Sequence, residues 1–344
     1  MSKLNQIEMV LFSCPFCLVW NRMYTKEMKY PFFILVAFFS FCSCTANDDF
    51  EKDNGRVVPQ EMARDKIYNI LIIGNSLARD AFCYVPPIME EICPDLMVNM
   101  KIMYVSGNPL KTHWNYIAQK KAKFVCDVYT SYSGAWTSSS GWFADDIVSS
   151  YSWNLVVFQE GSVNARTYDN SQPYVSNIIE FVESIQPNST FAYTIIPSLP
   201  DGASSLGEST SDEIWAMNVE TAKKLLDNGI VSFLLPCGTG IQNARKTSLD
   251  NYGDFGHLTY DGRHLQEGIP CVVDAYTATE SILRIMEIDS TIENSKLRVT
   301  QKWINLLNVL GPHGMVLEGS DIDYSLARRC ALLAIEYPYE ISIP

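Results

Sequence analysis

One short stretch constrains the fold of this chain more than any other: residues 67–76, Ile-Tyr-Asn-Ile-Leu-Ile-Ile-Gly-Asn-Ser. Its run of apolar, mostly β-branched side chains has the length of a buried strand and stops at Gly74. Residues 77–92 then repeat apolar side chains at helical spacing. A strand, a glycine turn and a helix in this order predict that Ser76 lies at the C-terminal edge of a sheet. We expect unpaired backbone N–H groups of the helix start beside it.

Two interpretations of Asn75-Ser76 are open at this point. An exposed serine beside free N–H donors suits a nucleophile whose product is an oxyanion. The same pair is also typical of a plain helix N-cap, because short polar side chains accept hydrogen bonds from the first N–H groups of a helix. The rest of the chain has to decide between a nucleophile and a cap.

Further strand-like segments alternate with helix-like ones along the chain. We expect strands at 96–105, 154–158, 190–196 and 230–235, helices at about 110–122, 173–184, 212–228 and 265–286, and a short hairpin or loop at 125–141. This alternation predicts a three-layer α/β/α sandwich around a mostly parallel, five-stranded sheet. Polar or glycine turns follow the predicted strands, at the sheet edge where ligands bind in such folds.

The N-terminal part predicts export from the cytoplasm. Residues 28–44 carry a basic residue, Lys29, next to their start and continue with an apolar run, 30–41, that is shorter than the roughly 20 residues of a membrane span. Cys44 after this run resembles the lipidated cysteine of bacterial lipoproteins, with Phe41 in place of the usual leucine. We therefore expect a leader and signal peptide in 1–44 and a polar tether in 45–66. The product would be a periplasmic or cell-surface protein of a Gram-negative-type bacterium, anchored at Cys44.

Charge and composition argue against several classes of function. The formal net charge of −13 leaves no basic surface for nucleic acid, and it disfavours docking on anionic lipid. The cysteines outside the leader show no metal-ligand spacing, so we expect no metal. The sequence Gly-Asn-Ser-Leu-Ala-Arg differs from the dinucleotide motif Gly-x-Gly-x-x-Gly, and we expect no cofactor.

A serine nucleophile needs a base, and Asp261-Gly-Arg-His264 offers one directly before the predicted helix 265–286. An aspartate and a histidine three residues apart around a turn are able to point into one cleft. The carboxylate then orients the imidazole, whose other nitrogen faces the serine hydroxyl. The simpler interpretation is that Asp261 caps the helix and His264 is a surface residue. Together with Gly-Asn-Ser after the first strand, the pattern favours a triad.

Four blocks of this sequence resemble those of the SGNH hydrolase, or GDSL-like, superfamily, over about residues 68–280. They are Gly74-Asn-Ser76, Gly107 after the second strand, the glycine-containing segment after the third strand, and Asp261-x-x-His264. Residues 110–114 and 155–162 look like an uncharacterised bacterial branch of that superfamily. The resemblance implies a flavodoxin-like domain over 67–344, with a C-terminal helical extension from about 288 that ends in a helix at about 324–336.

The same resemblance implies roles for individual residues. Ser76 would be the nucleophile, His264 the general base and Asp261 the residue that orients the imidazole. The oxyanion hole would use the backbone N–H groups of Ser76 and Gly107 and one side chain from the third block.

That third block departs from the usual Gly-x-Asn-Asp, because the chain has Gly161-Ser-Val163-Asn164. The side-chain donor must then come from another position. Gln159 is the first candidate and Asn164 the second.

Three further residues are candidates for lining the substrate pocket: Asn75, His113 and Trp136. His113 is equally compatible with a buried helix position. The aromatic residues of 129–143 suit either a sugar-binding rim or ordinary packing, and packing is the commoner use.

The sequence as a whole predicts a serine esterase that hydrolyses small acyl esters, such as O-acetyl groups on carbohydrates, through an acyl-enzyme. Its partners would be a small ester or acetylated glycan and, through Cys44 alone, a membrane. A lipase with a larger acyl pocket is also compatible. The alternative from another class is a non-catalytic, surface glycan-binding lipoprotein on the same fold, in which Ser76, Asp261 and His264 need not converge.

Overall fold

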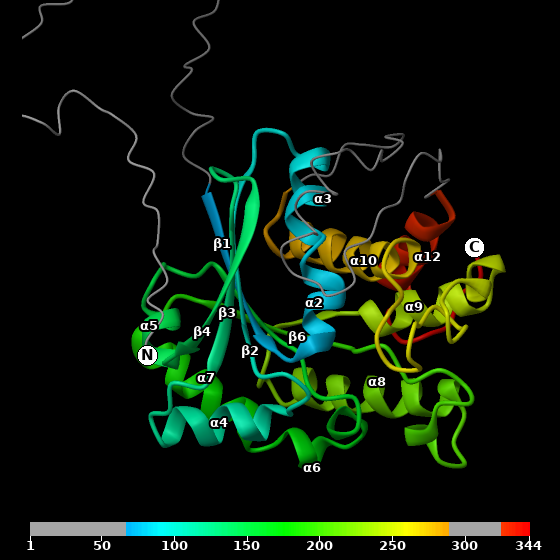
Figure 1. The fold of residues 1–344 in the computed structure, drawn as a ribbon, viewed down its shortest axis with the longest axis horizontal. Coiled ribbons are helices and arrows are strands. Elements are labelled where there is room, and N and C mark those ends of the chain that lie inside the picture. Colours follow the sequence, from blue (N-terminus) through cyan, green and yellow to red (C-terminus); the bar gives the residue numbers. More distant parts are fainter. Residues whose placement is uncertain (1–66, 289–324) are drawn as a thin grey trace, which may run out of the picture. The chain divides into compact units, whose positions relative to one another are not determined.

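A seven-stranded sheet runs through the middle of the protein in the computed structural model, which describes residues 67–288 and 325–344 (Figure 1). The strands are β1 (Ile67–Gly74), β2 (Met97–Tyr104), β3 (Phe124–Thr130), β4 (Ala135–Trp142), β5 (Leu155–Phe158), β6 (Thr190–Thr194) and β7 (Phe233–Leu235). Their order is β4-β3-β2-β1-β5-β6-β7. The five strands from β2 to β7 in this order are parallel, whereas β3 and β4 form an antiparallel hairpin at one edge.

All five predicted strands are present as the parallel part of the sheet, but the predicted number of strands is wrong. The segment that we expected to be a short hairpin or loop adds two full strands through the pairing of β3 with β2. The apolar alternation is weak in β4, where Thr137 and the serines that follow it are exposed. Pairing with β3, rather than a hydrophobic pattern of its own, makes this segment a strand.

The helices cover both faces of the sheet. They are α2 (Ser76–Phe82), α3 (Val85–Ile92), α4 (Leu110–Ala118), α5 (Ala144–Val148), α6 (Tyr168–Ser171), α7 (Tyr174–Ile185), α8 (Ser211–Asp227), α9 (Cys237–Arg245), α10 (Ile269–Ile285) and α12 (Ser325–Glu336). Three 3₁₀ turns add η1 (Asn164–Arg166), η2 (Ser204–Leu206) and η3 (Ser248–Asn251). The predicted helix 77–92 is two helices, because Pro86 and Pro87 fit only in the first turn of a new one.

Alternate residues of β1 belong to two separate hydrophobic cores, as expected for a strand with both faces buried. Ile70 and Ile72 pack with residues of α2, α3 and α10, whereas Leu71 and Ile73 pack with residues of α4, α7 and α8. Figure 1 shows these two groups of helices on opposite sides of the sheet. The predicted three layers are therefore present.

The parallel strands follow the order β2-β1-β5-β6-β7, which is the flavodoxin-like doubly wound order. The chain reverses its direction of growth between β1 and β5. Ligands of such sheets bind in the crevice at this switch point, beyond the C-terminal ends of the strands. Ser76 directly follows β1 and therefore lies at that point.

The last helix, α12, packs against α10. Its residues Ala327 and Cys330 are buried in the same core as α10, and Asn243 Nδ2 of α9 donates to the Cys330 carbonyl oxygen at 3.1 Å. All six cysteines of the described part are free thiols. The predicted signal peptide, Cys44, the tether and most of the extension from about residue 288 lie outside the described residues.

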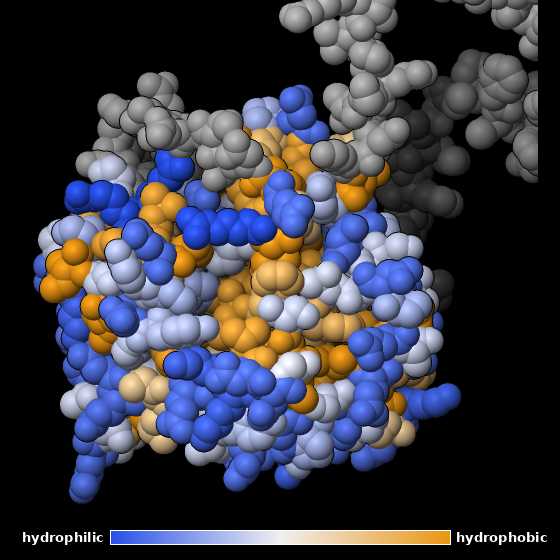
Figure 2. All heavy atoms as spheres, turned by 180° about the vertical axis from the view of Figure 1, so that it is seen from behind, coloured by the Kyte–Doolittle hydropathy of each residue, from blue (hydrophilic) through white to orange (hydrophobic). Residues whose placement is uncertain are grey.

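Figure 2 shows the opposite face, where hydrophobic residues gather in the middle and hydrophilic residues surround them. Within 67–288 and 325–344, none of the helices combines the length and the hydrophobicity that a membrane span requires.

Gly238 provides a test of how closely α9 approaches the sheet. Its N–H donates to the Ile195 carbonyl oxygen at 2.6 Å, and a side chain at this position would overlap the carbonyl group of Ile196. Because backbone cannot move aside cheaply, we expect Gly238→Ala to lower the free energy of unfolding by about 3 kcal/mol, measured by urea denaturation. Gly161→Ala is the matched control, since its Cβ would meet Pro109 only at 3.6 Å. Equal stability of both variants would contradict the packing described here.

Candidate active site

The turn after β1 presents Ser76 at the start of α2. Asn75 is the N-cap of this helix, and its Oδ1 accepts a hydrogen bond from the Leu77 N–H at 3.0 Å. Its Nδ2 donates to the Asn108 carbonyl oxygen at 3.3 Å, in the loop after β2. Asn75 is thus a helix cap with only 4% of its surface exposed, and its role in lining a substrate pocket stays a prediction. Ser76 itself is half-buried.

The structure brings together the three residues of the predicted triad. Ser76 Oγ lies 2.9 Å from His264 Nε2, and His264 Nδ1 lies 2.8 Å from Asp261 Oδ2. A carboxylate only accepts hydrogen bonds, so Nδ1 carries the proton and Nε2 is free to accept from the serine hydroxyl. Although 188 positions separate Ser76 from His264, the two form the contact of a nucleophile and its base.

Asp261 is held in its charged form by its neighbours. Burial on its own would raise the pKa of Asp261, but hydrogen bonds from the side chain and backbone of His264 outweigh it, and the pKa is lowered. Asp261 Oδ1 accepts from the N–H groups of Arg263 and His264 at 2.9 and 2.7 Å. The carboxylate therefore stays ionised beside the imidazole at neutral pH.

We call residues 246–268, which connect α9 to α10 and carry Asp261 and His264, the base loop. Asp80 of α2 binds this loop directly, because its Oδ2 accepts from the Leu265 N–H at 3.0 Å. Loss of solvent raises the pKa of Asp80 well above its ordinary value. Tyr260 stacks on the His264 ring at a centroid distance of 5.7 Å. The nucleophile helix thus helps to position the residue next to the base.

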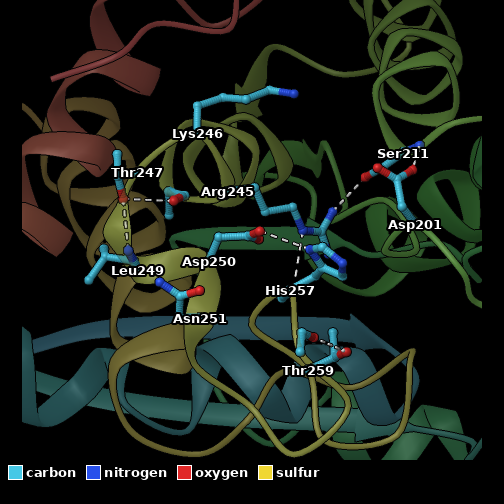
Figure 3. Close-up of polar contacts among 12 residues, drawn as sticks. Asp201, Ser211, Arg245, Lys246, Thr247, Leu249, Asp250, Asn251, His257 and Thr259 are labelled. Carbon is cyan, nitrogen blue, oxygen red and sulfur yellow. Dashed lines mark hydrogen bonds and ion pairs between the residues drawn. The ribbon is translucent and has the colours of Figure 1, made fainter.

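A buried arginine, Arg245, anchors the base loop from the other side (Figure 3). Its Nε donates to the His257 carbonyl oxygen at 3.3 Å, and its Nη1 contacts the hydroxyl groups of Ser198 and Ser211, both at 2.9 Å. The His257 ring in turn pairs with Asp250 through Nδ1 and Oδ2, 2.9 Å apart. Burial lowers the pKa of Arg245 to about 10, at which it is still charged at neutral pH. These contacts join the base loop to the segment between β6 and α8.

Two other residues that we predicted to line the pocket, His113 and Trp136, are buried in the protein interior. His113 is fully buried, with Nε2 2.7 Å from the Gly74 carbonyl oxygen and Nδ1 3.1 Å from that of Pro109. Burial lowers the pKa of His113, which favours the neutral ring. Trp136 is 1% exposed, and its indole N–H donates to the Cys83 carbonyl oxygen. The pocket-lining prediction is therefore wrong for both.

Gln159, our first candidate for the oxyanion hole, lies beneath the nucleophile turn. Its Oε1 accepts from the Asn75 N–H at 3.1 Å, and its Nε2 donates to the Glu160 carbonyl oxygen. The orientation of the amide follows from the first contact, since a backbone N–H only donates. With 2% of its surface exposed, Gln159 supports the turn and does not face a substrate.

The other oxyanion candidates have donors available. Within the described part of the chain, neither the Ser76 nor the Gly107 backbone N–H has a hydrogen-bond partner, and the same holds for the Asn164 side-chain amide. Gly107 adopts a positive φ of 66° and is exposed, and Asn164 starts η1 in the segment that follows β5. Asn164, our second candidate, is therefore the better one.

Glu160 is a site residue that the sequence reasoning missed. It is fully buried, and its Oε1 accepts from the N–H groups of Gly161 at 2.7 Å and Leu110 at 2.9 Å. Its Oε2 is buried with no partner among the described residues, and burial raises the pKa of Glu160 to about 7. The sequence did contain a signal for this residue: an acidic side chain in the turn that follows the wholly apolar strand β5. Glu160 ties the third block to the start of α4.

Fold and site together define an α/β protein with serine, histidine and aspartate side chains in contact at the C-terminal edge of a parallel sheet. By its sequence, the chain belongs to the family described as "Domain of unknown function (DUF4886)", whose model matches residues 69–302. None of the curated proteins compared with it matches the chain.

Solved structures show a similar fold. A DUF4886 family protein from Bacteroides uniformis is 17% identical, with a TM-score of 0.66 over 80% of this chain and 98% of that one. A GDSL-like lipase from Bacteroides thetaiotaomicron (12% identity, TM-score 0.36, 67% of this chain and 90% of that one) is more distantly similar. So is a family two carbohydrate esterase from Cellvibrio japonicus (13%, 0.35, 64% and 62%). The first likeness establishes the fold, and the other two are too weak to assign a reaction.

The described residues contain no group of three or more histidine, cysteine, aspartate or glutamate side chains placed to hold a metal ion.

Replacing Glu160 by glutamine should change how stability depends on pH. A carboxyl group whose pKa rises on folding from 4.5 to about 7 stabilises the fold when protonated. This contribution is present below about pH 4.5 and is lost as the pH rises through about 7. Over that window, we expect the free energy of unfolding to fall by up to about 3 kcal/mol more in the wild type than in Glu160→Gln.

Urea unfolding at about pH 5 and about pH 8 measures this difference. Glu180→Gln, at an exposed position of α7, removes the same charge and should keep the wild-type dependence. If Glu160→Gln and the wild type lose the same stability between the two pH values, Glu160 does not titrate as described.

Proposed function

We propose that this protein is a serine esterase that hydrolyses small acyl esters through an acyl-enzyme. The observation that carries the proposal is the chain of two contacts, Ser76 Oγ to His264 Nε2 at 2.9 Å and His264 Nδ1 to Asp261 Oδ2 at 2.8 Å. A glycan-binding protein without catalytic activity does not need these contacts. Three side chains from two distant segments form the arrangement that activates a hydroxyl group for nucleophilic attack.

In the first half of the reaction, Ser76 Oγ attacks the carbonyl carbon of the ester while its proton moves to His264 Nε2. Asp261 keeps the ring oriented and stabilises the imidazolium. The carbonyl oxygen becomes an oxyanion, for which the backbone N–H groups of Ser76 and Gly107 and the side-chain amide of Asn164 are the proposed donors. The tetrahedral intermediate then collapses, and the alcohol leaves with the proton from His264.

In the second half, His264 Nε2 takes a proton from water, whose oxygen attacks the acyl group on Ser76. The second tetrahedral intermediate releases the carboxylic acid, and the proton returns from His264 to Ser76 Oγ. One ester and one water become one acid and one alcohol, and the enzyme is regenerated.

For the substrate we propose an O-acetyl group on a carbohydrate. This choice rests on the sequence resemblance and on the predicted tether at Cys44, which would place the protein outside the cytoplasm where glycans are accessible. A short-chain preference is the directly testable part of this proposal.

Removing the nucleophile or the base should abolish ester hydrolysis. We expect Ser76→Ala and His264→Ala to lower kcat on p-nitrophenyl acetate by at least about 10³, because the members of a triad act as a unit. Acetate should be a better substrate than the butyrate and octanoate esters. Ser184→Ala, on the exposed surface of α7, is the matched serine control and should retain wild-type activity. Equal hydrolysis by the wild type and the Ser76 and His264 variants would refute the mechanism.

Asn164 and Gln159 should respond differently to truncation, because only one of them is free to donate to an oxyanion. We expect Asn164→Ala to lower kcat by about 10²–10³ with little change in KM or in Tm. Gln159→Ala leaves the buried Asn75 N–H without an acceptor and should lower stability by about 1–3 kcal/mol. Kinetics and thermal unfolding of both variants separate the two roles. The assignment fails if Asn164→Ala keeps full activity.

A further inference from the structure

Two arginines from different loops meet at one serine. Arg166, the last residue of η1, donates from Nη2 to the Ser205 carbonyl oxygen at 3.0 Å. Arg263, in the base loop, donates from Nη2 to Ser205 Oγ at 3.1 Å. Ser205 lies in η2, in the segment that connects β6 to α8. Two guanidinium groups that are 97 positions apart in the sequence are therefore neighbours in space.

Neither arginine is neutralised by the described part of the protein. No carboxylate there forms an ion pair with Arg166 or Arg263, whereas Arg79 forms a bidentate pair with Asp127. Arg166 Nε is buried without a hydrogen-bond partner, and burial lowers the pKa of Arg166. Buried charge without a partner costs free energy. Arg263, by contrast, is exposed to solvent. Two neighbouring guanidinium groups with no carboxylate paired to them are unexpected in a chain with a net charge of −13, and they suit the binding of an anion.

The two arginines belong to the segments that carry the proposed active-site residues. Arg263 directly precedes His264, the residue that returns a proton to the departing alcohol in the mechanism above. Arg166 follows the proposed oxyanion donor Asn164 by two positions in η1. The pair thus belongs to the two segments that would surround the ester, and its contact with Ser205 joins both to the same neighbouring loop.

We infer that Arg166 and Arg263 bind a carboxylate on the alcohol part of the substrate, so that the enzyme prefers acyl esters of acidic sugars, of the uronic acid type, over neutral ones. This inference rests on the proposed esterase function. Guanidinium groups match the planar, two-oxygen geometry of a carboxylate and bind it through short, charge-assisted hydrogen bonds. The alcohol side is chosen because Arg263 neighbours the group that protonates the leaving alcohol. Local positive charge also offsets the repulsion that an anionic substrate meets near an acidic protein.

The test compares two esters that differ only in charge: 3-acetoxybenzoate and its neutral methyl ester. We expect wild-type kcat/KM to be at least about tenfold higher for the anion, the value of one charge-assisted hydrogen bond in this setting. The double variant Arg166→Gln/Arg263→Gln should bring this ratio to about one. The variant Arg166→Lys/Arg263→Lys keeps both positive charges but lacks the planar, two-pronged donor geometry of the guanidinium group. It should give an anion-to-neutral ratio between those of the wild type and the double glutamine variant. Raising the salt concentration from about 0.01 to about 1 M should reduce the wild-type ratio.

Arg284→Gln is the matched control, because it removes one positive charge from an exposed position in the last turn of α10. Its anion-to-neutral ratio should equal that of the wild type. Equal rates on both esters in the wild type, or an unchanged ratio in the double glutamine variant, would overturn the inference. The esterase proposal would still stand if Ser76→Ala were inactive.

A result in which neither ester is hydrolysed would refute the proposed function, and binding then tests the arginine pair on its own. Calorimetric titration of the Ser76→Ala protein with glucuronate should show binding that the added Arg166→Gln/Arg263→Gln changes abolish. Binding of glucose and glucuronate with the same affinity, or of neither, would reject the arginine site.

Discussion

The hydrogen bond from the Asn75 N–H to Gln159 Oε1 joins the ends of β1 and β5 at the point where the sheet changes direction. This hydrogen bond brings the Gln159 side chain very close to Gly74. A Cβ on Gly74 would lie 2.7 Å from Gln159 Oε1 and 3.0 Å from Gln159 Cβ, so only glycine fits there. The Gly74 carbonyl oxygen is bound by His113. Two strand ends and one buried helix residue thereby determine where Ser76 stands.

His264, the proposed base, is positioned in a similar way, because polar side chains form hydrogen bonds with backbone groups of the loop that carries it. Asp80 and Arg245 hold the C-terminal part and the middle of the base loop through the Leu265 N–H and the His257 carbonyl oxygen. A loop of more than 20 residues whose only helical element is the 3₁₀ turn η3 would otherwise lose much of its order to conformational entropy. Because Asp80 belongs to the same helix as Ser76, α2 both presents Ser76 and binds the loop that carries His264.

The arginine pair illustrates a different use of charge. Glu160 and Arg245 are buried and Asp80 is partly buried, and each accepts from or donates to neighbouring groups that fix its place. The side chains of Arg166 and Arg263 donate hydrogen bonds only to Ser205 among the described residues, so most of their donors have no protein partner there. Charged side chains that stabilise the fold are paired with groups of the fold itself. The inferred role of Arg166 and Arg263 is instead to bind a ligand, which requires donors that the protein does not use.

The sequence by itself determined the elements whose signals are local. The apolar runs predicted all five parallel strands, and Gly-Asn-Ser with Asp-x-x-His predicted the three side chains that meet, because a strand-turn-helix and a four-residue turn are encoded over few residues. Only the tertiary structure decided which way Gln159, His113 and Trp136 point, that β3 and β4 complete the sheet, and that Arg166 meets Arg263. Those outcomes depend on packing between segments tens of residues apart or more, and hydrophobic periodicity carries no information about such contacts.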